Sequence, residues 1–280
     1  MWGGMNPPHL TDRSQLGRNR ARAARAPALF LQQEALALVK ERLQEVNRSF
    51  TAAALVTAAP GLWGPAFPGA KLVADEDLLD LEPGAHDLVL HALTLHWASD
   101  PVGQIIQARR ALRPDGLFLA VLFGGGTLHE LRASLAEAEV ALTGGLSPRV
   151  APMGEIRELG GLLGRAGLAL PVADSLTLRV SYGSALALMR DLRAMGEGNA
   201  LAARNRHPPP RALFESAEAL YRRAYGTPDG RLPATFELIF LTGWAPDPGQ
   251  ARPLRPGSAR MRLAQALGTL EHPAGNRGGD

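Results

Sequence analysis

Residues 86–126, HDLVLHALTLHWASDPVGQIIQARRALRPDGLFLAVLFGGG, carry the pattern that decides the fold class. The short apolar runs at 87–91 and 117–123 have the length and composition of strands that are buried on both faces of a parallel sheet. The stretch 102–112 between them has helical periodicity, and the turn-forming residues Arg113–Gly116 separate it from the second run. Strand, helix and strand in this order predict an open α/β sheet with right-handed crossovers.

Comparable patterns flank this stretch on both sides. Thr127 and Glu130 have the spacing of a capping box, which predicts that a helix begins directly after the three glycines. Pro60-Gly61 ends an apolar run and opens a loop rich in proline and glycine that reaches Lys71. The expected elements are, in order, a helix at 29–47, strands at 52–58 and 71–74, the stretch above, helices at 127–142 and 154–166, and alternating strands at 174–182 and 234–244.

The two last strands are separated by far more chain than a hairpin loop needs, which favours a lid or a partner surface in the insertion. The predicted organisation is a basic N-terminal segment (1–28), a Rossmann-like core (29–183), a helical insertion or lid (184–226), the last core strand (227–246) and a C-terminal tail (247–280).

Composition excludes several classes of protein. The chain has 280 residues and no cysteine, so disulfides, thiolate metal sites and cysteine nucleophiles are excluded. No uncharged apolar stretch reaches the ~18 residues that a membrane span needs, so a soluble, cytoplasmic protein is expected. The sequence pI is about 9.8, but the net charge is only +3. The sequence has no stripe of basic residues with interleaved aromatics, so nucleic-acid binding is not predicted. The arginines of the first 28 residues are interpreted as a solvated helix face.

Several ordered motifs carry a resemblance to a known family. They are HDLVLHALTLHW (86–97), ALRPDGLFLAVLFGGGTLHELR (111–132), SPRVAP (147–152), LALMRDLRAMGEGNAL (186–201), PDGRLPATFELIFLTGWAP (228–246) and RPLRPGSA (252–259). Together they resemble class I S-adenosylmethionine-dependent methyltransferases. The nearest branch contains the mitochondrial complex I assembly factor that hydroxylates an arginine, and a more distant one contains the malonyl-acyl-carrier-protein methyltransferase of biotin synthesis.

The resemblance implies a seven-strand sheet with S-adenosylmethionine bound at the carboxyl ends of the strands, and a protein substrate such as a complex I subunit. In the family the first strand ends in an acidic residue and a G-x-G loop, whose glycines let main chain approach the ligand. The matching stretch here, 54–63 (ALVTAAPGLW), has the single glycine Gly61 and no acid. Only about ten residues then precede the strand at Lys71, so one βα unit is expected to be missing. The sheet is therefore predicted to be shortened near its first strands.

The candidate site residues follow from strand ends and from the resemblance. Asp75 matches the acid that contacts the adenine amine in the family, and Glu76 is beside it. His91 and Gly61 complete the candidate cofactor-binding set. His96 could act as a general base and Trp97 could stack on a planar group, so they are the candidate catalytic residues.

Each candidate has a structural alternative. Asp75 and Glu76 could belong to an acidic loop, and the histidines and the tryptophan could simply be packed. Gly124–Gly126 could be an anion-binding nest or a tight turn, and we favour the turn. No histidine has the spacing of a metal ligand, so no metal is predicted. Two hypotheses stay open. The chain is either an enzyme that modifies a protein, or a catalytically inactive assembly or binding protein that has lost its cofactor site.

Overall fold

The computed structural model describes residues 9–250, 265, 268 and 269. They divide into two units, Met1–Pro246 and Asp247–Asp280. The motif at 252–259 and most of the predicted tail lie outside the described residues. In the second unit Gln250 N donates to Asp247 O at 3.2 Å, which closes a turn.

The first unit contains a six-stranded sheet in the order β2-β1-β3-β4-β6-β5. The first four of these strands run parallel, and β6 is antiparallel to both β4 and β5. The α/β prediction, with a shortened sheet and an antiparallel final hairpin, is confirmed. The strands are β1 (Ala53–Thr57), β2 (Lys71–Val73), β3 (His86–Ala92), β4 (Leu112–Phe123), β5 (Ala169–Tyr182) and β6 (Leu232–Trp244).

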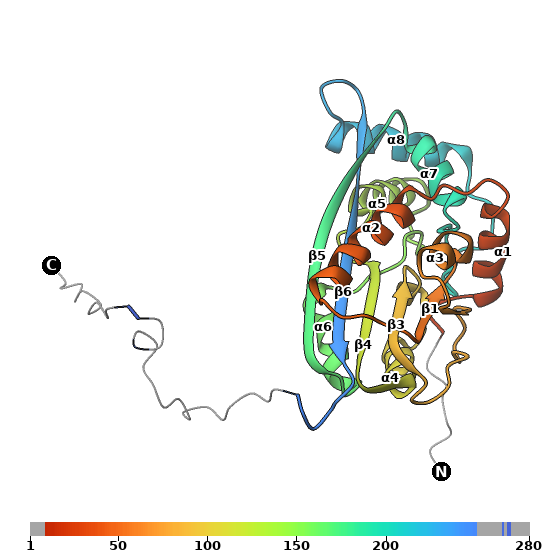
Figure 1. Ribbon diagram of the computed structural model, residues 1–280. Coiled ribbons are helices and arrows are strands. Elements are labelled where there is room, and N and C mark those ends of the chain that lie inside the picture. The colour runs from red at the N-terminus through yellow and green to blue at the C-terminus, as the bar shows by residue number, and fades with distance from the viewer. Residues whose placement is uncertain (1–8, 251–264, 266–267, 270–280) are drawn as a thin grey trace, which may run out of the picture. The chain divides into compact units, whose positions relative to one another are not determined.

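Helices cover both faces of the sheet (Figure 1). One face buries alternate strand residues such as Leu55, Leu90 and Leu119 in a core with α2, α5, α7 and α8. The other face buries Val89 and Phe118 with α4 and α6. The helices are α1 (Arg13–Ala23), α2 (Phe30–Glu45), α3 (Pro60–Ala66), α4 (Pro101–Ala111), α5 (His129–Thr143), α6 (Ile156–Arg165), α7 (Ala185–Ala194) and α8 (Arg211–Tyr225), with the short 3-10 helix η1 (Leu95–Trp97).

Three local predictions are wrong. The supposed loop after β1 forms the short helix α3, which Pro60 begins because it needs no N–H donor there. The supposed turn at 113–116 belongs to β4, where Asp115 adopts a left-handed φ of 59° and the pairing with β3 shifts register. Thr127 does not cap α5. Its hydroxyl donates to Glu237 O at 3.2 Å, and the residue before the helix is Leu128.

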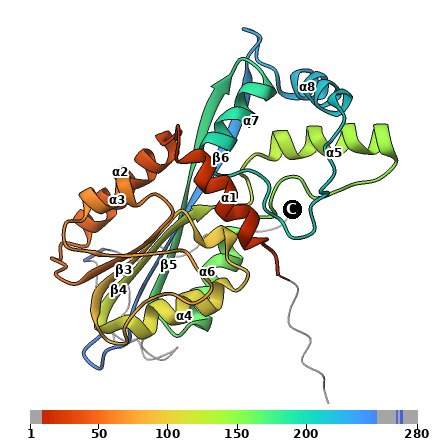
Figure 2. The same ribbon diagram turned by 90° about the vertical axis from the view of Figure 1, so that its right-hand side faces the viewer.

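The helix α1 lies along the segment that follows α7 (Figure 2). Asp12 N donates to Ala200 O at 2.8 Å, Ala202 N donates to Leu10 O at 2.9 Å, and Ala28 N donates to Ala194 O at 3.1 Å. The predicted insertion (184–226) contains α7 and α8. The chain on both sides of α1 is therefore hydrogen-bonded to the part of the insertion that includes the end of α7 and the residues just after it. In the part of the chain that the structure describes, no helix has both the length and the apolar character that a membrane span requires.

Candidate functional site

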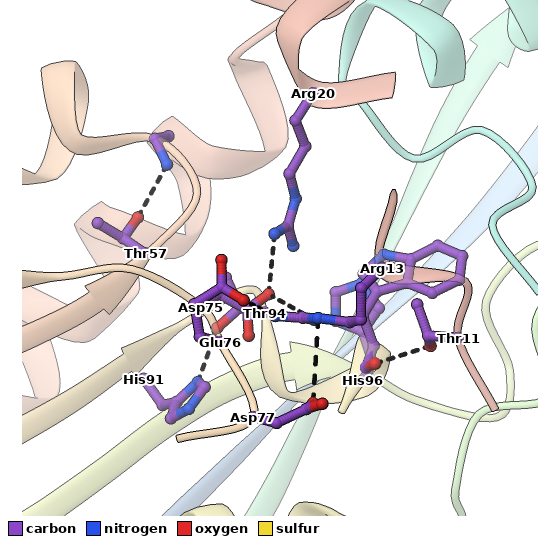
Figure 3. Close-up of polar contacts among 12 residues, drawn as sticks. Thr11, Arg13, Arg20, Thr57, Asp75, Glu76, Asp77, His91, Thr94 and His96 are labelled. Carbon is purple, nitrogen blue, oxygen red and sulfur yellow. Dashed lines mark hydrogen bonds and ion pairs between the residues drawn. The ribbon is translucent and has the colours of Figure 1, made fainter. Parts of the chain in front are cut away.

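The candidate residues Asp75, Glu76, His91 and His96 lie close together where the parallel strands end (Figure 3). Asp75 and Glu76 follow β2, His91 lies near the end of β3, and His96 and Trp97 lie in η1 directly after it. Between β3 and η1, the buried Leu93 adopts a left-handed φ of 50° and turns the chain along this edge. Because ligands of open α/β sheets bind outside the carboxyl ends of the strands, this is the expected place for a site.

Asp75 is buried and already paired with arginines of α1. Its side chain is 1% exposed, and Oδ2 lies 2.9 Å from Arg20 Nη1 and 3.5 Å from Arg13 Nη1. These two arginines belong to the basic segment that the sequence interpretation assigned to a solvated face, and that interpretation is wrong for both of them. The carboxylate is therefore not open to an adenine amine in this arrangement. Glu76 is exposed, and its Oε2 lies 3.9 Å from Arg13 Nη2.

A cavity of about 310 Å³ opens at the end of β1, beside Gly61. Its lining includes residues 58–62 together with Arg20, Gln32, Met195 and Glu197. Gly61 is exposed, and a Cβ added at this glycine would meet no atom within 4 Å.

The bulky aromatic residues of α3 do not fill this cavity. Trp63 is fully buried, donates from Nε1 to Gln32 Oε1 at 2.7 Å and stacks on Phe67 with ring centroids 6.5 Å apart. Neither ring lines the cavity. The start of α3 therefore leaves an open cavity at the tip of β1, although residues 58–62 include no acidic side chain.

His91 is fully buried and does not line this cavity. Its Nδ1 lies 2.7 Å from Thr94 Oγ1. Burial lowers its pKa to about 4 and outweighs the opposing charge of Asp75. The imidazole of His91 is therefore neutral at pH 7 and is buried near the end of β3.

His96 and Trp97 converge on a carboxylate that the sequence interpretation did not single out. Trp97 Nε1 donates to Glu197 Oε2 at 2.6 Å, and His96 Nε2 lies 3.1 Å from the same oxygen. Glu197 lies 100 residues or more away in sequence, in the turn MGEG after α7. The one local signal for it was an acid between two glycines, which also fits an ordinary surface turn.

A second, apolar cavity of about 220 Å³ lies on the other side of Glu197. Its walls include Trp97, Phe123, Met189, Met195 and Phe236, which come from η1, β4, α7, the turn after α7 and β6. Met195 and Glu197 line both cavities and so form a wall that the two cavities share. His96 lines neither cavity. Its ring packs edge-on against Phe123, with centroids 4.9 Å apart.

The main-chain N–H groups of the three glycines after β4 all donate hydrogen bonds to other residues of the protein. Gly124 N donates to Glu237 O, Gly125 N to Gly154 O and Gly126 N to Glu237 Oε2, at 2.9, 3.1 and 2.8 Å. The tight-turn interpretation therefore fits these contacts, and no main-chain donor of this turn is left for an anion. Among the described residues no group of three or more His, Asp or Glu side chains could hold a metal ion.

Known proteins with similar sequences identify the family. A family model described as a methyltransferase domain matches residues 22–120. The chain is 39% identical over 197 residues to the mitochondrial arginine-hydroxylase NDUFAF5 of Danio rerio, and the alignment covers 70% of this chain. The chain belongs to the class I S-adenosylmethionine-dependent methyltransferase family.

Two other similarities extend this comparison. The malonyl-acyl-carrier-protein O-methyltransferase of Laribacter hongkongensis is 37% identical over 186 residues, which is 66% of this methyltransferase-family chain. The chain spans 61% of the zebrafish protein's length and 59% of the Laribacter protein's length. The solved structure of the YcgJ protein from Bacillus subtilis aligns with a TM-score of 0.48 and 12% identity, over 77% of this chain and 99% of that one.

Proposed function

We propose that the chain binds S-adenosylmethionine at the carboxyl end of β1 and modifies another protein during the assembly of respiratory complex I. The observation that carries the proposal is the open cavity beside Gly61, at the strand end where this family would be expected to bind its cofactor. The relatives named arginine-hydroxylase NDUFAF5 support a protein substrate. S-adenosylmethionine supplies an activated methyl group when it is bound.

The residues around the cavity fit one end of this cofactor better than the other. Arg20 lines the cavity, and its buried Nε and Nη2 have no hydrogen-bond partner among the described residues. Such donors suit the carboxylate at the amino-acid end of the cofactor. At the nucleoside end, Asp75 could receive the adenine amine only after Arg20 turns away from it.

In this proposal the two cavities have different occupants. The cavity beside Gly61 holds the cofactor, and the apolar cavity holds the side chain of the protein substrate. Trp97 would flank that side chain with its ring, and the aromatic and methionine walls would keep water away from it. The shared wall at Met195 and Glu197 would bring the two occupants together.

A second candidate is a catalytically inactive assembly protein that keeps the scaffold and binds a partner. The ion pairs of Asp75 with Arg13 and Arg20 favour it, because they occupy the acid that the family would be expected to use for adenine. The missing acid after β1 favours it as well.

Comparison of complex I from cells with and without this gene separates the two candidates. The enzyme is expected to leave one subunit of wild-type complex I heavier by a methyl group or an oxygen atom in intact-mass spectrometry, and this increment is expected to vanish in the deletion strain. An inactive assembly protein would lower the amount of complex I with no mass difference in any subunit. If neither the mass of any complex I subunit nor the amount of complex I changes, both candidate functions are wrong.

A further inference from the structure

Glu197 is the one acidic residue among the described residues that line the two cavities, and it lines both of them. Its position depends on the turn that follows α7. Gly196 has a left-handed φ of 83°, and Gly198 O accepts a hydrogen bond from Asn19 Nδ2 of α1 at 2.9 Å. The carboxylate is therefore placed by main chain that packs against α1.

The two oxygens of Glu197 differ in their surroundings. Oε2 accepts from Trp97 Nε1 at 2.6 Å and lies 3.1 Å from His96 Nε2. Oε1 takes part in no hydrogen bond with another described residue, and the side chain is 13% exposed. One oxygen is thus held by two ring nitrogens, and the other is left to accept from a ligand.

The carboxylate is ionised despite its burial. Burial opposes its charge, but the neighbouring charges of His96 and Arg20 and the hydrogen bonds from His96 and Trp97 outweigh it and hold the pKa of Glu197 below its usual range. A buried carboxylate with an unfilled acceptor position attracts a positively charged donor.

Arg20 and His96 offset part of this charge from outside the apolar cavity, and neither arginine that lines that cavity forms an ion pair with Glu197. Arg149 lines the cavity, but its Nε and Nη2 bind the carboxylate of Glu139 at 3.0 and 2.6 Å. Arg193, the other arginine of the lining, is exposed. The remaining walls are mainly aromatic and aliphatic.

We infer that Glu197 is a ligand-binding residue whose Oε1 accepts a hydrogen bond from a protonated amine, or a similar cationic donor, carried on an apolar stem in the apolar cavity. His96 and Trp97 are positioning residues that hold Oε2 and so aim Oε1. This differs from the role expected for His96 from sequence, because His96 lines neither cavity, whereas Trp97 also lines the apolar cavity. The inference names the kind of group that the proposed substrate cavity accepts, and its test uses no cofactor.

Titration of the full chain with n-butylammonium chloride tests the inference, with the Trp97 indole N–H followed by NMR. The chain has four tryptophans, so Trp97→Phe identifies the signal by its loss. We expect a saturable shift with n-butylammonium and none with n-butyrate, which has a similar stem and the opposite charge. Glu197→Gln should weaken n-butylammonium binding by about tenfold or more, the effect of losing one charge-assisted hydrogen bond. Glu158→Gln, an exposed carboxylate on α6, should leave it unchanged.

His96 variants test the positioning role. His96→Leu removes the donor to Oε2 and should weaken binding, whereas His96→Gln keeps an N–H donor and should restore most of the affinity. Each variant is first checked for an unchanged free energy of unfolding or a dispersed spectrum, so that loss of fold is told apart from loss of binding. The inference is overturned if the wild-type signal does not shift, if butyrate and butylammonium shift it equally, or if Glu197→Gln binds like the wild type. Failure of S-adenosylmethionine to bind would refute the proposed function and leave these outcomes unaffected.

Discussion

His91 predicts a specific loss of stability when the pH falls below neutrality. Its side chain is fully buried, and burial lowers its pKa from 6.5 to about 4. The unfolded chain therefore takes up a proton near pH 6.5 that the folded chain refuses, so the contribution is full above pH 6.5 and is lost as the pH falls toward 4. A shift of this size corresponds to about 3 kcal/mol over the whole window, and about 2 kcal/mol of it should be lost between about pH 7 and about pH 5.

Urea unfolding at several pH values measures this loss. The wild-type free energy of unfolding should fall with pH, and His91→Leu should remove about 2 kcal/mol of that fall because it removes the titrating group. His207→Gln is the matched control, because His207 is exposed and should leave the slope unchanged. The reasoning is refuted if His91→Leu keeps the wild-type slope, or if His207→Gln flattens it as much as His91→Leu does.

Two packing predictions concern the region around the sheet edge. Trp63→Ala should lower the free energy of unfolding by about 3–5 kcal/mol, because the ring is fully buried, and a loss below about 1 kcal/mol in urea unfolding would contradict the packing described for α3. Gly124→Ala should cost about 1–3 kcal/mol, because its Cβ would lie 2.5 Å from Glu237 Oε2 and 2.5 Å from Cδ1 of Ile239, which is fully buried and has little room to move. Gly61→Ala has open space and should be nearly neutral, and equal losses in thermal unfolding would show that the crowding argument is wrong.

Sequence patterns predicted the core of the fold because its strands are strongly apolar and evenly spaced. The stretch 86–126 predicted β3, α4 and β4 in the correct order, and the shortage of chain after β1 predicted a shortened sheet. The boundary errors came from local rules that tertiary contacts override. Asp115 has the left-handed backbone conformation typical of a turn, but it lies inside a strand. The Thr127 hydroxyl donates to Glu237 O of β6 and does not cap the helix.

Only the candidate residues that lie at or just after strand ends could be predicted from the sequence. Strand ends placed Asp75, His91 and Trp97 at one edge, since parallel strands end together. The partners of these residues come from distant segments, so no local pattern predicts them. Arg20 reaches Asp75 from α1, and Glu197 reaches Trp97 from the turn after α7.

Calorimetric titration with S-adenosylmethionine tests the central claim most directly when wild-type protein is compared with Gly61→Trp. Gly61 lines the cavity and a Cβ there would meet no atom within 4 Å, so a bulky indole at this position is expected to obstruct the cavity without a clash at its Cβ. We expect saturable binding to the wild type and loss of binding in Gly61→Trp, with the free energy of unfolding unchanged. Absence of heat from the wild type at millimolar ligand, or equal binding by both proteins, would contradict a cofactor site at the tip of β1.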